Sequence, residues 1–294
     1  MKKTILSMIW ALALVAMVFG CEKAPRNNDG SSEVETPSEY FWHFSVKNVD
    51  AGWPIGVFVR DYKVAITNGE FHLDASTGAS FEIKTDYSLS AGGKIYAYSP
   101  YAEGNDKHNA LKLTIPTEQV SGAVPMPRVA VPVELSEPSQ ESTATLSFYD
   151  LAGSLEVKVY STKSTGEKVS AIAFESSEPL AGRFVFNAKA ADPNQASTVA
   201  ISGYTEKKVS STGSFVVDTD PDSAGSLTLV LAPGTYSGTM TVTTDADTYG
   251  IVLEEPVTVL RGEKSSVTVR IAPRNDQDSG GNAEEFEGGV LETK

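Results

Sequence analysis

Cysteine and histidine are scarce in this chain. Cys21 is the only cysteine among 294 residues, and the histidines are three: His43, His72 and His108. A lone cysteine has no disulfide partner within the chain, so packed cores must stabilise the folded parts. The Gly-x-Ser-x-Gly turn of serine hydrolases is absent. His43 and His72 fall in strand-like runs and His108 in a polar loop, which is typical of structural histidines. We expect no catalytic residue, no cofactor and no enzymatic activity.

Positive charge is also in short supply. The chain has 24 lysine and arginine residues against 38 aspartate and glutamate residues, which gives a formal net charge of −14. Proteins that bind nucleic acid rely on basic surfaces to neutralise phosphates. We therefore expect no nucleic-acid partner.

The N-terminus carries a clear targeting signal. Two lysines near the start precede an apolar run, residues 5–19, which is too short to span a membrane comfortably. Val18 and Gly20 then lead into Cys21 with the spacing of a bacterial lipobox. This pattern predicts a signal peptide over residues 1–20, cleavage between Gly20 and Cys21, and an acyl anchor on Cys21 in the lipid of the outer membrane. The alternative is an ordinary secreted protein that is cut near Gly20.

Composition divides the remaining chain into four parts. Residues 21–38 are polar and poor in large apolar side chains, which predicts a flexible tether. Two strand-rich segments follow, 39–163 and 164–273, and the small and charged residues near 161–167 mark the boundary between them. Residues 274–294 are rich in acid and glycine, which predicts a flexible acidic tail.

Short alternating runs of β-branched and aromatic residues fill both strand-rich segments. In Leu155-Glu156-Val157-Lys158-Val159 every second residue is apolar, which is the period of a strand with one buried face. No amphipathic helix is evident. The clearest strands are predicted at residues 40–47, 55–59, 94–99, 111–115, 143–149, 154–160, 169–174, 183–187, 214–217, 226–231, 239–243, 249–253, 257–260 and 265–271. Strands of this number and spacing indicate β-sandwiches.

An ordered set of short motifs resembles the fimbrillin-like lipoproteins of Bacteroides-type bacteria. The motifs are Trp-Pro-Ile-Gly-Val-Phe at 53–58, Lys-Ile-Tyr-Ala-Tyr-Ser-Pro-Tyr at 94–101, Ile115-Pro116 with Gln119, Leu-Ser-Phe-Tyr at 146–149 before Ser-Leu-Glu-Val at 154–157, and Leu-Ala-Pro-Gly-Thr-Tyr at 231–236. The resemblance covers residues 40–272. It implies an all-β chain of two tandem transthyretin-like Greek-key β-sandwich domains, with a role in surface fimbriae or cell adhesion.

The resemblance also implies a route to assembly. In pilus-forming members an arginine-specific protease removes the first strand, and a strand of a neighbouring subunit takes its place by strand addition. Here residues 40–47 would be that strand, but the following segment, 48–52, contains no arginine. We therefore expect an unprocessed accessory, anchor or stand-alone subunit in fimbrial assembly or adhesion, which could still join other fimbrial subunits by strand addition.

Two further sets of residues suggest binding sites. Asp218, Asp220 and Asp222 alternate in a loop, as calcium ligands do, but the chain lacks the glycine and glutamate that complete such a loop, so no metal is expected. Trp42 and Trp53 could stack on sugar rings, but packing in a sandwich core explains each of them better, since Trp42 lies in an aromatic strand. The rival function is a surface glycan-binding lipoprotein for nutrient capture, which would share the anchor, the tether, the acidity and the β-domains. An envelope hydrolase is a third and weaker hypothesis.

Overall fold

The computed structural model describes residues 40–47, 54–59, 62–64, 72–74, 78–85, 94–134, 141–191 and 199–272. These residues form strands and loops, with one 3-10 turn, η1 (Ala188–Ala190), as the only helical element among them. The prediction of an all-β fold is confirmed. No helix in this part of the chain is long and apolar enough to cross a membrane. The predicted signal peptide, tether and acidic tail lie outside the described residues.

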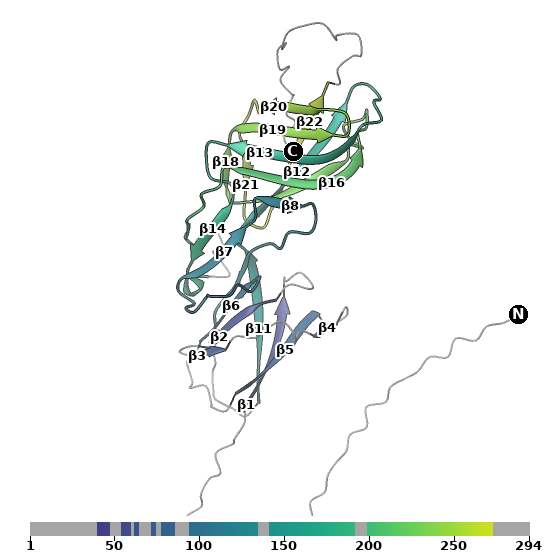
Figure 1. Ribbon diagram of the computed structural model, residues 1–294. Coiled ribbons are helices and arrows are strands. Elements are labelled where there is room, and N and C mark those ends of the chain that lie inside the picture. The colour runs from purple at the N-terminus through teal and green to yellow at the C-terminus, as the bar shows by residue number, and fades with distance from the viewer. Residues whose placement is uncertain are drawn as a thin grey trace, which may run out of the picture. The chain divides into compact units, whose positions relative to one another are not determined.

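The first part of the chain builds a nine-stranded sheet. Its main path runs β3-β2-β6-β9-β11-β1-β5-β4, and β10 pairs with β6 beside this path (Figure 1). The strands are β1 (Tyr40–Lys47), β2 (Gly56–Val59), β3 (Tyr62–Val64), β4 (His72–Asp74), β5 (Gly78–Thr85), β6 (Lys94–Ser99), β9 (Arg128–Ala130), β10 (Val133–Glu134) and β11 (Glu141–Asp150). Neighbouring strands are antiparallel except β1 and β11, which are parallel.

The remaining strands form four smaller sheets. Their orders are β17-β12-β22, β20-β19-β13-β16-β8, β15-β14-β7 and β18-β21. The strands are β7 (Leu111–Ile115), β8 (Glu118–Val120), β12 (Gly153–Ser161), β13 (Lys168–Ser176), β14 (Gly182–Phe186), β15 (Ile201–Ser202), β16 (Lys208–Val216), β17 (Ser226–Leu231), β18 (Gly234–Tyr236), β19 (Gly238–Thr244), β20 (Thr248–Val252), β21 (Val257–Val259) and β22 (Lys264–Ile271).

The period-two pattern of the sequence explains which faces are buried. Along β12, Leu155, Val157 and Val159 are fully buried, and the residues between them are partly exposed. The inner face of β13 contributes Ile172 and Phe174 to the same hydrophobic cluster. Alternating side chains therefore place the apolar half of each strand between the sheets, as in a sandwich.

Strand pairing crosses the predicted domain boundary near residue 163. β12 precedes that boundary, yet it pairs only with β17 and β22 among the described strands. Two strands of the first half, β7 and β8, pair with β14 and β16 of the second half. The first and second halves thus share ladders, and the division into two domains stays a prediction.

Candidate functional site

Strand β1 occupies an interior position in the nine-stranded sheet. It pairs antiparallel with β5 on one side and parallel with β11 on the other. Phe44 lies opposite Phe81 of β5 and Ala144 of β11 in this register. Because both edges of β1 are paired along most of its length, its backbone is held by two ladders at once.

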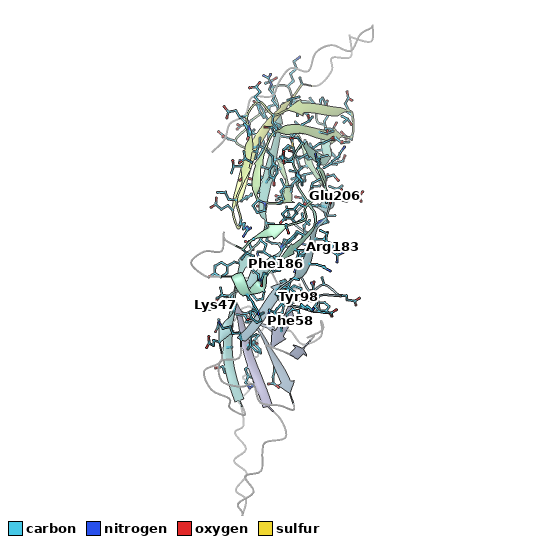
Figure 2. The ribbon with its side chains drawn as sticks, turned by 90° about the vertical axis from the view of Figure 1, so that its left-hand side faces the viewer. Lys47, Phe58, Tyr98, Arg183, Phe186 and Glu206 are labelled. Atoms are coloured by element: carbon cyan, nitrogen blue, oxygen red, sulfur yellow. The ribbon has the colours of Figure 1, made fainter. Side chains whose placement is uncertain are left out.

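Side chains alternate along the second half of β1. Phe44 and Val46 are buried, with 2% and 7% of their surfaces exposed, whereas His43, Ser45 and Lys47 are exposed. Lys47 ends the strand at the position labelled in Figure 2. Burial of two apolar side chains of this size contributes on the order of 3–6 kcal/mol to holding the strand in place.

Polar contacts on the outer face of β1 are few and exposed. The hydroxyl oxygens of Ser45 and Thr145 lie 2.8 Å apart across the pairing with β11. His43 Nδ1 lies 3.1 Å from Glu82 Oε2 on β5, and about half of each side chain is exposed. Exposed pairs of this kind contribute little. β1 is therefore held by its two backbone ladders and its apolar residues.

Removal of β1 would leave a defined groove. The facing edges of β5 and β11 would lose their backbone partners in β1. A strand with apolar residues at alternate positions would restore both ladders. In this structure the chain's own first strand supplies both ladders.

A tight aromatic contact lies further along the same sheet. A Cβ atom on Gly56 of β2 would collide with the ring of Tyr98 on β6, so glycine is required there. The ring of Phe58 stacks on that of Tyr98 with centroids 5.8 Å apart, and the two are labelled side by side in Figure 2. The Tyr98 hydroxyl donates to the carbonyl of Ala102 at 3.1 Å. The motifs at 53–58 and 94–101 are thus linked by packing.

The structure describes only some of the residues predicted for binding or lipidation. Gly20, Cys21 and Trp53 lie outside the described residues. Trp42 falls within β1, opposite Ile83 of β5. Its position in the interior strand is described, and its role in glycan stacking stays a prediction.

Two of the three loop aspartates bind the backbone of their own turn through their carboxylates. Asp218 Oδ1 accepts the amide of Asp220 at 3.1 Å, and Asp220 Oδ1 accepts the amide of Asp222 at 2.9 Å. The amide of Asp220, with the Ser223 hydroxyl, holds the pKa of the exposed Asp218 carboxyl below its ordinary value. No group of three metal-ligating side chains comes together in the described part of the chain.

The three histidines have separate surroundings. His43 contacts Glu82 on the surface, and His72 lies in the short strand β4. His108 stacks on Tyr96 with ring centroids 4.2 Å apart and planes 3° from parallel. His43 therefore makes a polar contact on the surface, and His108 takes part in an aromatic stack.

Two buried polar contacts were not anticipated from the sequence. Gln119 is 4% exposed, and its amide group binds both backbone groups of Val230 at 2.8 Å. The carboxylate of Glu167, 8% exposed, accepts hydrogen bonds from the hydroxyls of Thr244 and Tyr249 at 2.7 and 3.0 Å. In the sequence Gln119 is only part of a family motif, because nothing local points to a partner 111 residues away.

Comparison with known proteins finds similar folds among solved structures, but no similar sequence. No family model matches the chain, and no curated protein matches its sequence. A proposed cell adhesion protein from Bacteroides ovatus superimposes with a TM-score of 0.52 at 16% identity, over 88% of this chain and 96% of that one. One from Bacteroides uniformis gives 0.50 at 14% identity, over 88% and 98%. A fimbrial assembly protein from Parabacteroides distasonis gives 0.43 at 9% identity, over 80% and 92%.

Proposed function

We propose that this protein is a lipid-anchored cell-surface protein of the fimbrial or adhesion type, which acts by binding and not by catalysis. The observation that carries the proposal is the fold it shares, over 88% of its length, with a structure described as a proposed cell adhesion protein. The lipobox at Cys21 supplies the anchor, and the acidic, strand-rich composition suits a surface protein.

We further propose that it is an accessory, anchor or stand-alone subunit that keeps β1. Two ladders and two buried side chains hold that strand, and the segment that follows it, 48–52, offers no arginine for cleavage. Other fimbrial subunits would then be contacted through sheet edges and loops that stay exposed while β1 is in place.

Metabolic labelling tests the anchor. Cells supplied with labelled palmitate should incorporate it into the wild-type protein and not into Cys21→Ala. A full-length protein that carries no label, or that is recovered dissolved in the periplasm, would contradict the anchor.

A disulfide lock tests the retention of β1. Ser45 and Thr145 face each other across β1 and β11, so Ser45→Cys combined with Thr145→Cys should tie the first strand to the sheet. If β1 is retained, the locked protein reaches the surface and assembles as wild type does, and Ser45→Cys alone is the matched control. Loss of assembly in the locked protein alone would show that the strand must leave.

A further inference from the structure

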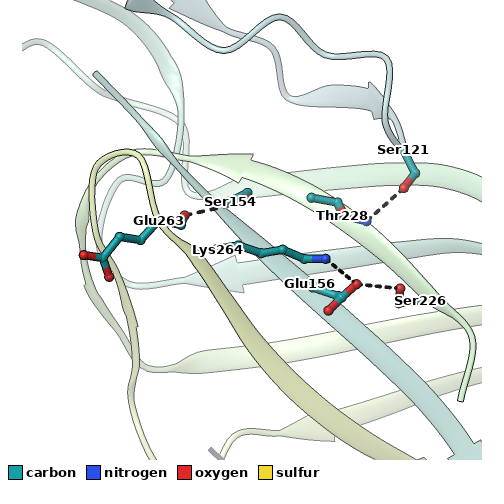
Figure 3. A network of polar contacts seen from close by, with 7 residues as sticks. All are labelled: Ser121, Ser154, Glu156, Ser226, Thr228, Glu263 and Lys264. Carbon is teal, nitrogen blue, oxygen red and sulfur yellow. Dashed lines mark hydrogen bonds and ion pairs between the residues drawn. The ribbon is translucent and has the colours of Figure 1, made fainter. Parts of the chain in front are cut away.

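The sheet edges in the described part of the chain differ in how they are protected. β17 is an edge strand of its sheet, yet its outward groups are covered by side chains. Gln119 binds the amide and carbonyl of Val230. Ser121 Oγ accepts the amide of Thr228 at 2.9 Å (Figure 3). These contacts close the edge to any further strand.

Most other edges are short or charged. β3, β4 and β8 have three residues each, too few to template a stable ladder. β22 is longer but carries Lys264 at its start and Arg270 near its end. Short edges and basic residues are the usual means by which proteins discourage unwanted strand pairing.

β20 lacks these protections. It forms one edge of the five-stranded sheet, and among the described strands it pairs with β19 alone (Figure 1). Its sequence, Thr-Tyr-Gly-Ile-Val, contains no charge and no proline. At its end, Val252 has 56% of its surface exposed, which leaves apolar area that an added strand would bury.

The pairing with β19 shows which backbone groups face outward. The amide of Leu253 donates to the carbonyl of Gly238 at 2.9 Å, so odd-numbered residues here bond to β19. Because the bonds of an antiparallel ladder alternate, Thr248, Gly250 and Val252 direct their amides and carbonyls away from β19. Asp247 Oδ1 accepts the Thr248 amide at 2.7 Å, which leaves the amides of Gly250 and Val252 for a further strand.

Acidic residues bracket this edge at both ends. Asp245 and Asp247 precede β20, and the exposed Glu254 and Glu255 follow it. Antiparallel pairing of two copies about Gly250 would oppose Asp245 with Glu255, and parallel pairing would stack identical carboxylates. Like charges in direct opposition are destabilising, so a second copy of β20 is a poor partner, whereas a strand with basic ends is complementary.

We propose that the free edge of β20 binds an extended segment of a partner protein, with alternating apolar residues and basic residues at both ends. The segment adds to the five-stranded sheet as a sixth strand, bonds to the amides of Gly250 and Val252, and covers the Val252 side chain. This site goes beyond the proposed function. It is separate from the β1 groove and needs no release of β1.

Peptide titration of the full mature chain tests the site. The probe is a fluorescent peptide of alternating threonine and valine with two lysines at each end, and its control replaces the lysines with glutamates. The lysine peptide should bind about tenfold more tightly, and less so in high salt. By NMR hydrogen exchange, the Gly250 and Val252 amides should exchange rapidly in the free protein and become protected on binding.

Charge reversal distinguishes this site from a nonspecific attraction. Glu254→Lys combined with Glu255→Lys should reverse the preference toward the glutamate peptide. Glu118→Lys combined with Asp222→Lys makes the same change in net charge elsewhere on the surface and should leave the preference intact. The proposal is overturned if neither peptide binds, if both double variants behave alike, if the two amides are already protected in the free protein, or if the chain dimerises through β20.

Discussion

Replacement of Gln119 by methionine should destabilise the protein far more than its small change in volume suggests. The Gln119 amide donates to the carbonyls of Val230 and Pro116 and accepts the amide of Val230, with distances of 2.8 to 2.9 Å. Methionine fills similar space and can make none of these bonds. Leaving the amide and the carbonyl of Val230 unpaired costs about 1–3 kcal/mol each, so we expect a loss of about 2–6 kcal/mol.

The assay is chemical denaturation followed by tryptophan fluorescence, with the free energy of unfolding obtained by linear extrapolation. Ser121→Ala is the matched control on the same edge, because it removes the single acceptor of the Thr228 amide. Its expected cost is about 1 kcal/mol. If Gln119→Met unfolds within about 0.5 kcal/mol of wild type, the Gln119 contacts do not stabilise the edge as argued.

Glutamate at the same position adds a dependence on pH. The side chain of Gln119→Glu would keep an acceptor for the Val230 amide, but its ionised form would face two carbonyl oxygens in a buried site. Burial and that repulsion raise the pKa of the new carboxyl above its unfolded value, so the folded state binds a proton more readily. Stability should therefore be lost as the pH rises through that range and regained on acidification. A variant that is equally stable at pH 4 and pH 7, relative to wild type, would contradict this reasoning.

Three further predictions use the same unfolding measurement. Phe44→Ala should cost about 3–5 kcal/mol, because it empties a buried position of β1, and a cost below about 1 kcal/mol would mean that β1 is not packed as described. Gly56→Ala should destabilise the chain, because the new methyl group collides with the ring of Tyr98. Adding Tyr98→Leu to this variant should recover part of the loss, and if the costs of the two single changes simply add in the double variant, the contact is refuted. Desolvation opposes ionisation of Glu156, but hydrogen bonds from Lys264 and Ser226 prevail and lower the pKa of its carboxyl. The contribution of Glu156 to the free energy of unfolding is therefore present at neutral pH and should be lost on acidification. If Glu156→Gln shows the same dependence of unfolding free energy on pH as wild type, this prediction is wrong.

Long alternating strands could be predicted from the sequence because their burial is a local, period-two signal. β1, β6, β7 and β17 have the predicted bounds, and β12 differs by one residue at each end. Most strands of two or three residues, such as β8 and β10, escaped prediction because they are too short to show a period, whereas β21 falls within the strand predicted at 257–260. The eight-residue strand β5 was also missed, although Phe81 and Ile83 alternate with polar residues in it.

The surroundings of β1 were predictable only in part, because one of the strands that pair with it is distant in the sequence. The first strand could be located from its aromatic residues, but its parallel pairing with β11, about 100 residues later, is set by the whole sheet. The pairing of β12 with β22 has the same origin, which is why a linker-based boundary did not anticipate it. Gln119 illustrates the limit most clearly, since its role depends on an edge of β17 that only the folded chain creates.

The most direct test of the central claim is the mass of the mature N-terminus in protein taken from cells. We predict a chain that begins at acylated Cys21 and still contains β1. A chain that begins near Asn48, or one that begins after residue 20 without an acyl group, would contradict the account of a lipid-anchored surface protein that keeps its first strand.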